Sequence, residues 1–464
     1  MATEQKFRVE RDSMGEMKVP AGAYYAAQTQ RAVENFPISG IRFSRPMIAA
    51  LGLIKRSAAT VNRALGLLDE ARAKAIVAAA EEVEKGALDS HFVLDIFQTG
   101  SGTSTNMNAN EVIASRAKEL VGGELTFHPN DHVNMSQSSN DVIPTAMHVA
   151  VALECERTLI PALAQLAASL ARKSKQFEHI VKTGRTHLAD ATPITLGQEF
   201  SGYQSQVEQG IKRVQRALTT ILELPIGGTA VGTGLNTHPE FAQRIVAELN
   251  SRTGLRFSET PNHFEAQAAK DAIVEMSGQL KTIACSFAKI ANDIRWLGSG
   301  PRCGLGELLL PEVQPGSSIM PAKVNPVIAE SVLMVAAQVI GNDAAVTIGG
   351  HSGGSFELNV MMPVMAHNIL QSVELLSTSA KNFAIRCIDG IEADEARLHQ
   401  LAEANISTVT ALAPKIGYDK AAQLAKEAHK SGATLREVAA KHNVLPAEEL
   451  EKALDLIAMT KPGL

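Results

Sequence analysis

One run of apolar residues restricts the fold more than any other feature of this sequence. Apolar side chains recur every three or four positions, at Met276, Leu280, Ile283, Phe287, Ile290, Ile294 and Leu297. This spacing places all of them on one face of an α-helix, and the face continues through the whole run. Such a seam is buried most readily against other long helices. The sequence therefore predicts a bundle of long helices.

Two further segments carry helical stripes, and strand patterns are scarce. The stripes are Met47, Leu51, Ile54, Ala58, Val61 and Leu65, followed later by Val207, Ile211, Val214, Leu218 and Ile221. Alternating patterns are confined to places such as residues 7–19. Residues 332–340 are apolar on nearly every side, so a helix there must be covered all round, by its own chain or by neighbouring subunits. We expect an all-α fold whose central core extends across an oligomer interface.

Two shifts in composition predict three domains. The first shift falls near residues 134–139, and the second falls at Asp389-Gly390. We expect a mostly helical N-terminal domain (1–136), a central bundle of long helices (137–390) and a small C-terminal helical domain (391–464).

Charge and cysteine content exclude several classes of protein. The chain has 44 basic and 49 acidic residues, a net charge of −5, which argues against a surface for nucleic acid. The cysteines Cys155, Cys285, Cys303 and Cys387 lie far apart, as expected for reduced thiols. Neither they nor His128 and His132 have the spacing of a metal site. No stretch approaches the ~20 apolar residues of a membrane span. We expect a cytoplasmic protein with no metal, no cofactor, and no nucleic-acid or membrane partner.

Four polar segments interrupt the helical patterns. They are residues 98–106, 136–141, 184–187 and 316–326, rich in Gly, Ser, Thr and Asn. Three of them run into helical patterns, with Pro144 expected in the first turn of one helix and Pro326 opening another. Each segment fits either simple N-caps or anion sites at helix starts. Three helix starts together with Lys323 suit a small dianion such as a dicarboxylate.

The last of these segments resembles a known signature. It reads Gly-Ser-Ser-Ile-Met-Pro-Ala-Lys-Val-Asn-Pro over 316–326 and resembles the signature loop of the fumarase/aspartase superfamily. These enzymes add or remove water or an amine across a fumarate double bond. The segments 98–110, 128–131, 136–148, 184–193, 227–238 and 290–296 also resemble class II fumarases, so that the resemblance covers almost the whole chain.

Individual residues favour one branch of the superfamily. His187 stands where bacterial aspartases typically carry Gln, and Ser138-Ser139-Asn140 is also similar to fumarases, whereas Ala322 is more typical of aspartases. The resemblance implies hydration of fumarate to L-malate in the tricarboxylic acid cycle. Aspartate ammonia-lyase, or another fumarate-releasing lyase, is the alternative within the superfamily. The alternative that is not an enzyme is a non-catalytic structural or binding protein that retains the fold.

The resemblance also implies roles for particular residues. Ser317 is expected to remove the carbon-bound proton, with the amides of 316–318 and Lys323 stabilising its alkoxide. His187 would move protons at the hydroxyl carbon, partnered by Glu330. The implied substrate contacts are Ser101, Gly102, Thr103, Ser138, Ser139, Asn140, Thr186, Ser318, Lys323, Val324 and Asn325.

An oligomer and a second site are implied as well. The resemblance implies a homotetramer in which each active site is assembled from three chains. It also implies a second dicarboxylate site at His128, Pro129, Asn130 and Asp131. An arginine of that site is replaced here by Leu125, or by Thr126 in a shifted register, and an ordinary turn is the alternative interpretation.

Overall fold

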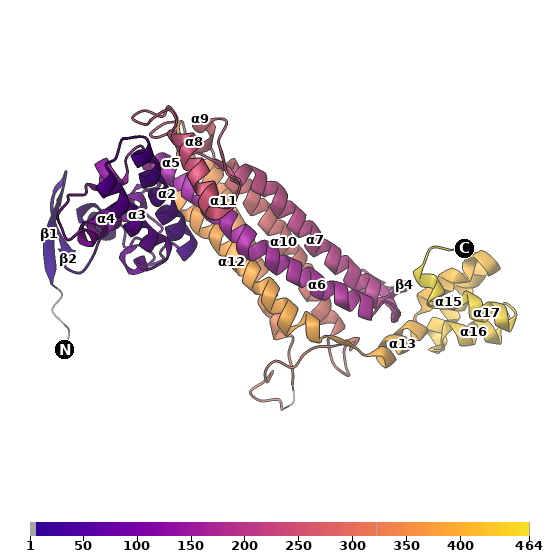
Figure 1. Ribbon diagram of the computed structural model, residues 1–464. Coiled ribbons are helices and arrows are strands. Elements are labelled where there is room, and N and C mark those ends of the chain that lie inside the picture. Colours follow the sequence, from indigo (N-terminus) through magenta and orange to yellow (C-terminus); the bar gives the residue numbers. More distant parts are fainter. Residues whose placement is uncertain (1–5, 322, 464) are drawn as a thin grey trace. The chain divides into compact units, whose positions relative to one another are not determined.

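The protein is predominantly helical, as predicted (Figure 1). The structure is a computed structural model that describes residues 6–321 and 323–463. The N-terminal helices are α1 (Ala27–Asn35), α2 (Arg45–Ala64), α3 (Glu70–Glu84), α4 (Thr103–Leu120) and α5 (Ser139–Glu154). The long helices are α6 (Ile160–Gln176), α7 (Leu196–Ile221), α10 (Asp271–Leu297), α11 (Val327–Gly353) and α12 (Met362–Arg386). The remaining helices are α8 (Phe241–Thr253), α9 (His263–Ala268), α13 (Glu395–Ala404), α14 (Ala413–Ile416), α15 (Tyr418–Ser431), α16 (Leu435–Lys441) and α17 (Ala447–Ala453).

The strands form only two-stranded sheets within the described residues. Two antiparallel hairpins are the longest, β1 (Phe7–Asp12) with β2 (Gly15–Pro20), and β3 (Val181–Thr186) with β4 (Ala189–Thr195). The short pairs are β5 (Glu223–Leu224) with β6 (Ser258–Glu259), β7 (Leu308–Leu309) with β10 (Glu392–Ala393), and β8 (Gly354–Ser355) with β9 (Leu358–Asn359). The strand pattern predicted near residues 7–19 is confirmed, and the all-α fold class with it.

The apolar seam of α10 is buried along its full length. Every seam residue from Met276 to Leu297 is at most 4% exposed. Hydrogen bonds link α10 to its neighbours, from Tyr203 on α7 to Asp293 and from Ser277 to Asp343 on α11. The prediction of packed long helices is therefore confirmed.

The described chain forms two compact units, each made of three chain segments. One comprises the described residues up to Pro161 together with 212–284 and 337–377, and the other comprises 162–211, 285–336 and the described residues from Thr378 onward. The long helices α7, α10, α11 and α12 contribute residues to both units. The three-domain division at residues 136 and 390 stays a prediction. Within the second unit, α15, α16 and α17 surround a small core that includes Leu424, Leu435, Val438 and Leu450.

Helix α11 departs from one expectation. Its length and mean hydropathy of 1.5 over an 18-residue window would allow it to cross a membrane, so the expectation that no stretch approaches a span is wrong for this helix. Only 39% of that window is buried in the single chain. Met334 is 67% exposed and Ile348 55% exposed. Within the described residues, α11 therefore leaves apolar side chains exposed.

Helix α5 begins earlier than predicted. Pro144 lies inside the helix and not in its first turn. The reason is a capping box between Ser138 and Asp141, which starts the helix at Ser139. Pro326 directly precedes α11, as predicted.

Buried His148 on α5 gives the fold a testable pH dependence. Its Nδ1 lies 3.0 Å from the Ile221 carbonyl oxygen and 2.9 Å from that of Glu223. Burial, assisted by the charge of Lys270, lowers the pKa of His148 to about 4. The unfolded chain binds a proton near pH 6.5 and the folded chain does not, so stability from this group is present above pH 6.5 and declines toward pH 4.

We expect the His148→Gln variant to lose that dependence, because an amide donates the same hydrogen bond without titrating. A pKa lowered to about 4 corresponds to roughly 3 kcal/mol over this range. Urea unfolding at fixed protein concentration, at pH 7 and pH 4.5, should show the stability gap between wild type and variant shrinking at the lower pH. The raised pKa of Asp141 also makes stability depend on pH, but this contribution is the same in wild type and variant. A stability difference between wild type and variant that does not change with pH would contradict the lowered pKa of His148.

Candidate active site

The first cluster of predicted site residues lies at the start of α4. This helix follows Gly102, whose φ is 72°, and the N-cap residue makes no side-chain hydrogen bond. Thr103 Oγ1 lies 2.8 Å from Ser101 Oγ and 2.7 Å from Ser139 Oγ, which joins the starts of α4 and α5 by a chain of hydroxyls. Gln98 Oε1 accepts the Thr105 N–H at 3.0 Å, so one amide of the first turn is already engaged. The N–H groups of Thr103 and Ser104 and the positive dipole end of the helix are left for an anion. The α4 start therefore suits a carboxylate.

The start of α5 is satisfied by its own side chains. Ser138 Oγ accepts the Asn140 N–H at 3.3 Å, and the Ser138 N–H donates to Asp141 Oδ1 at 2.9 Å. Asp141 is fully buried and also accepts the N–H groups of Gly227 and Thr229, both at 3.0 Å. Burial raises the pKa of this carboxyl to about 6 in spite of those hydrogen bonds. For Ser138 the capping interpretation accounts for the side chain.

Two glycines before α4 are sterically required. A Cβ on Gly100 would lie 1.8 Å from the Val360 carbonyl oxygen, and one on Gly102 would lie 2.9 Å from the Ile143 side chain. Neither position tolerates a larger residue without movement of its neighbours. The glycine content of residues 98–106 thus reflects close packing beneath the α4 start.

Thr186 and His187 lie at the tip of the β3–β4 hairpin and not at a helix start. Both side chains are exposed. His187 has a φ of 58° and Leu188 a φ of 61°, so the two-residue turn is left-handed at both positions. His187 is therefore an exposed residue at the tip of the hairpin.

The signature loop holds the Ser317 hydroxyl with two backbone donors. Ser317 Oγ accepts the N–H of Ile319 at 3.2 Å and the N–H of Met320 at 2.9 Å. These donors differ from the expected amides of 316–318, and the Gly316 N–H instead donates to the Lys323 carbonyl oxygen at 2.8 Å. A serine oxygen reaches the amides two and three residues ahead in this type of turn, which explains the difference.

The loop is closed on itself at its base. Asn325 Nδ2 donates to the Gly316 carbonyl oxygen at 2.6 Å, and a Cβ on Gly316 would lie 2.3 Å from the Lys323 oxygen. Ser317, Lys323 and Val324 line one cavity of about 550 Å³. Ser318 is exposed, and Ala322 lies outside the described residues.

Glu330 lies in the first turn of α11 and is half-buried. The histidines that form ion pairs among the described residues are His128, His263 and His442. The expected pairing of Glu330 with His187 is therefore not made within a single described chain.

The proposed second site is an exposed turn. His128 Nδ1 accepts the Asp131 N–H at 3.1 Å, and Asp131 Oδ2 lies 3.2 Å from the same nitrogen. Pro129 and Asn130 open a short π-helix (Pro129–Val133), for which His128 is the N-cap. The neighbouring Thr126 carbonyl oxygen accepts a hydrogen bond from Arg72 Nε at 3.0 Å. These contacts fit an ordinary turn and leave an arginine beside it.

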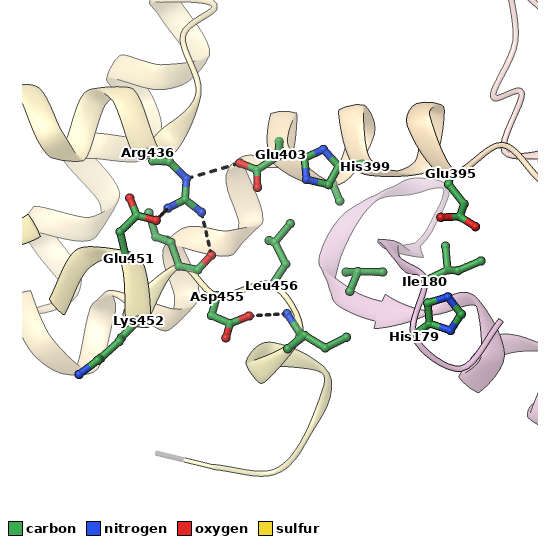
Figure 2. A pocket seen from close by; sticks show the side chains of 14 residues that line it. His179, Ile180, Glu395, His399, Glu403, Arg436, Glu451, Lys452, Asp455 and Leu456 are labelled. Carbon is green, nitrogen blue, oxygen red and sulfur yellow. Dashed lines mark hydrogen bonds and ion pairs between the residues drawn. The ribbon is translucent and has the colours of Figure 1, made fainter. Parts of the chain in front are cut away.

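Another cavity is lined by none of these residues. Figure 2 shows this cavity, which is about 600 Å³ in volume, with Arg436 joined to Glu403 and Glu451. His179 and His399 also line it. Because its arginine is already engaged by two carboxylates, we do not assign it to the dicarboxylate. Among the residues described, no three His, Cys, Asp or Glu side chains gather as metal ligands.

Comparison with known proteins identifies the family. Residues 15–341 match the family described as Lyase, and residues 409–461 match the family described as Fumarase C C-terminus. The chain belongs to this lyase family.

Individual relatives narrow the family further. The chain is 55% identical over 451 residues to the mitochondrial fumarate hydratase of Saccharomyces cerevisiae (96% of this chain, 92% of the relative). It is 54% identical over 460 residues to the class II fumarate hydratase of Nitrosomonas europaea (98% and 99%). The crystal structure of class II fumarase from Schistosoma mansoni superposes with a TM-score of 0.96 at 40% identity, covering 99% of this chain and all of that one. These relatives place the chain among the class II fumarate hydratases.

We expect Gly316→Ala to open the signature loop, because the added methyl group would collide with the Lys323 carbonyl oxygen. Hydrogen exchange measured by mass spectrometry should be about 10-fold faster in the peptide that carries the amides of Ile319 and Met320. Gly22→Ala is the control, since nothing lies within 4 Å of its added Cβ. Unchanged exchange in Gly316→Ala would show that the loop does not depend on this close approach.

Proposed function

We propose that this protein is a fumarate hydratase that catalyses the reversible, stereospecific hydration of fumarate to L-malate. One observation carries the proposal at the level of residues. The Ser317 hydroxyl accepts two backbone N–H groups in the cavity that Lys323 also lines. The names of the relatives support the same activity.

The chemical difficulty of this reaction is electrostatic. Removing a proton from the carbon beside a carboxylate of malate adds negative charge to a dianion. Catalysis requires donors that strengthen as this charge develops. A unit charge at 4 Å contributes roughly 4 kcal/mol at an effective dielectric near 20. Lys323, an exposed cation on the cavity wall, is placed to supply such a charge.

Ser317 is the proposed base. A serine hydroxyl removes a carbon-bound proton only if its alkoxide is stabilised. The N–H groups of Ile319 and Met320 point at this oxygen and supply that stabilisation without reorganising. Ser318, Val324 and Asn325, on the same loop, are the proposed neighbours of the substrate.

His187 is the proposed group for proton transfer at the hydroxyl carbon. Hydroxide leaves as water once it is protonated, and an imidazole is suited to this transfer near neutral pH. Glu330 from another chain is the proposed partner that orients the ring, and Thr186 is proposed to contact the substrate beside it.

The α4 start is the proposed site for the second carboxylate of the substrate. Ser101, Thr103 and Ser139 supply hydroxyls there, and Gly102 leaves the helix start open. Ser138 and Asn140 complete this wall of the site. The proposed mechanism uses no metal and no cofactor, because Ser317 and His187 perform the two proton transfers.

We propose that the active form is a homotetramer with each site built from three chains. The exposed apolar residues of α11 support a shared helical core. Among the described residues of one chain, His187 and Glu330 form no ion pair, which supports shared sites.

We further propose that the enzyme works in the cytoplasm, in the tricarboxylic acid cycle, without a nucleic-acid or membrane partner. All four cysteines are free thiols, as a reducing compartment requires, and two of them are exposed. A second dicarboxylate site at His128, Pro129, Asn130 and Asp131 is also proposed, with an ordinary turn as the alternative.

Ultraviolet absorbance tests the activity directly. Purified protein given L-malate alone should generate the absorbance of the fumarate double bond. No change with L-malate, together with ammonia release from L-aspartate, would favour the aspartate ammonia-lyase alternative and overturn the proposal. No turnover of either substrate would favour a non-catalytic protein.

The Ser317→Ala variant tests the proposed base. We expect near-complete loss of turnover, because the substitution removes the hydroxyl that accepts the proton. The oligomeric state, measured by light scattering, should be unchanged. Activity within a few-fold of wild type would exclude Ser317 as the base.

A further inference from the structure

The hairpin that carries His187 has an unusual turn. A two-residue turn with both residues left-handed normally contains Asn and Gly. Here the positions hold His187 and Leu188, and Leu188 is 73% exposed, so its side chain gains little packing within the chain. The remainder of the hairpin must therefore hold this turn in place.

Two cations of β3 are fixed by one buried carboxylate. Arg185 Nη2 donates to Glu307 Oε1 at 2.6 Å, and Lys182 Nζ lies 3.5 Å from Glu307 Oε2. The Glu307 side chain is completely buried, and the Lys182 side chain is 2% exposed. Glu307 thus contacts β3 at two positions, Lys182 and Arg185, which precede the turn.

Glu307 is itself held rigidly by its backbone. Its N–H donates to the Leu297 carbonyl oxygen at 2.8 Å, at the end of α10. Its carbonyl oxygen accepts the Asp394 N–H at 3.0 Å, directly before α13. The backbone of Glu307, from which the carboxylate extends, is therefore hydrogen-bonded to the end of α10 and to the residue before α13.

A second carboxylate balances the charge. Lys182 Nζ lies 2.9 Å from Glu199 Oε2 on α7, and Tyr203 Oη lies 3.1 Å from Glu199 Oε1 and 3.0 Å from Asp293 Oδ2. The cations Lys182 and Arg185 thus share the two carboxylates of Glu199 and Glu307. Removal of one partner from such a group leaves a buried charge without compensation.

We propose that Glu307 is a positioning residue for His187. By holding Arg185 and Lys182, it fixes β3 and thereby the direction in which the turn presents the imidazole. This inference rests on the proposed function in one respect, since it assumes that His187 acts in the reaction. A displacement of about 1 Å of a catalytic group can lower turnover by about 10²-fold.

A purely structural role for Glu307 makes a different prediction. A residue that only stabilises the fold lowers activity by the same factor whether His187 is present or not. A residue that acts through His187 has little left to change once the imidazole is gone.

A double-mutant cycle separates the two roles. We expect Glu307→Gln to lower kcat for L-malate by about 10- to 100-fold, with KM changed by less than about 3-fold. In the His187→Asn background, whose own loss is about 10²–10⁴-fold, the same substitution should change kcat by less than about 3-fold. Glu307→Asp, which keeps the charge, should recover part of kcat. Equal losses in both backgrounds, or no loss in wild type, would overturn the proposal.

Glu111→Gln is the matched control. Glu111 is also buried, but its carboxylate accepts the backbone N–H groups of Ala26, Gln28 and Thr29, far from the hairpin in sequence. Any effect of this variant should be the same in both His187 backgrounds. If Glu307→Gln does not fold, Arg185→Lys replaces it in the cycle, since it keeps the charge and loses the planar contact.

Crystal structures give a readout that does not depend on activity. In Glu307→Gln we expect the His187 ring to move by about 1 Å or more, or its backbone to leave the left-handed region. An unmoved ring would overturn the proposal even if wild type proved inactive on L-malate. Inactive wild type with a displaced ring would refute the function and retain the positioning role.

Discussion

The proposed site depends on backbone N–H groups, at turns and helix starts, that can donate hydrogen bonds to negative charge. A dicarboxylate that gains charge during reaction needs donors already in place, because donors that must first reorient lose part of their benefit. The N-cap residue of α4 is Gly102, which has no side chain to occupy the first amides of the helix, and Ser317 Oγ is held by the amides of Ile319 and Met320. Close packing makes this possible, since Gly100 and Gly316 each stand where a Cβ would strike a carbonyl oxygen.

The proposed tetramer accounts for two features of the single chain. The donors and the proton-transfer groups lie in three clusters, at the starts of α4 and α5, at the β3–β4 tip and in the signature loop with the start of α11. Glu330 has no imidazole partner within its own described chain, and α11 leaves apolar residues such as Met334 exposed. In the tetramer that we propose, other copies would cover this helix and supply the imidazole partner of Glu330.

The sequence predicted those parts of the fold that depend on local patterns. The α10 seam is visible because helical periodicity is a short-range property, and Pro326 marks a helix start for the same reason. The β3–β4 hairpin was not predicted, because Lys182 and Arg185 find their carboxylate partner Glu307 more than a hundred residues later. Likewise, the polar segment 316–326 indicated a special loop, but only its three-dimensional turn shows which amides contact Ser317. The site residues were accessible mainly through family resemblance, since spacing alone left capping and anion binding as alternatives.

Hybrid oligomers test most directly whether separate chains complete one site. Ser317→Ala and His187→Asn chains, each nearly inactive alone, are co-expressed with different tags, and mixed oligomers are isolated by both tags. If Ser317 and His187 of one site come from different chains, some mixed sites contain both native residues. Turnover of L-malate should then return to a substantial fraction of the wild-type rate. Mixed oligomers as inactive as their parents would contradict the account, because Ser317 and His187 would then serve the same site from the same chain.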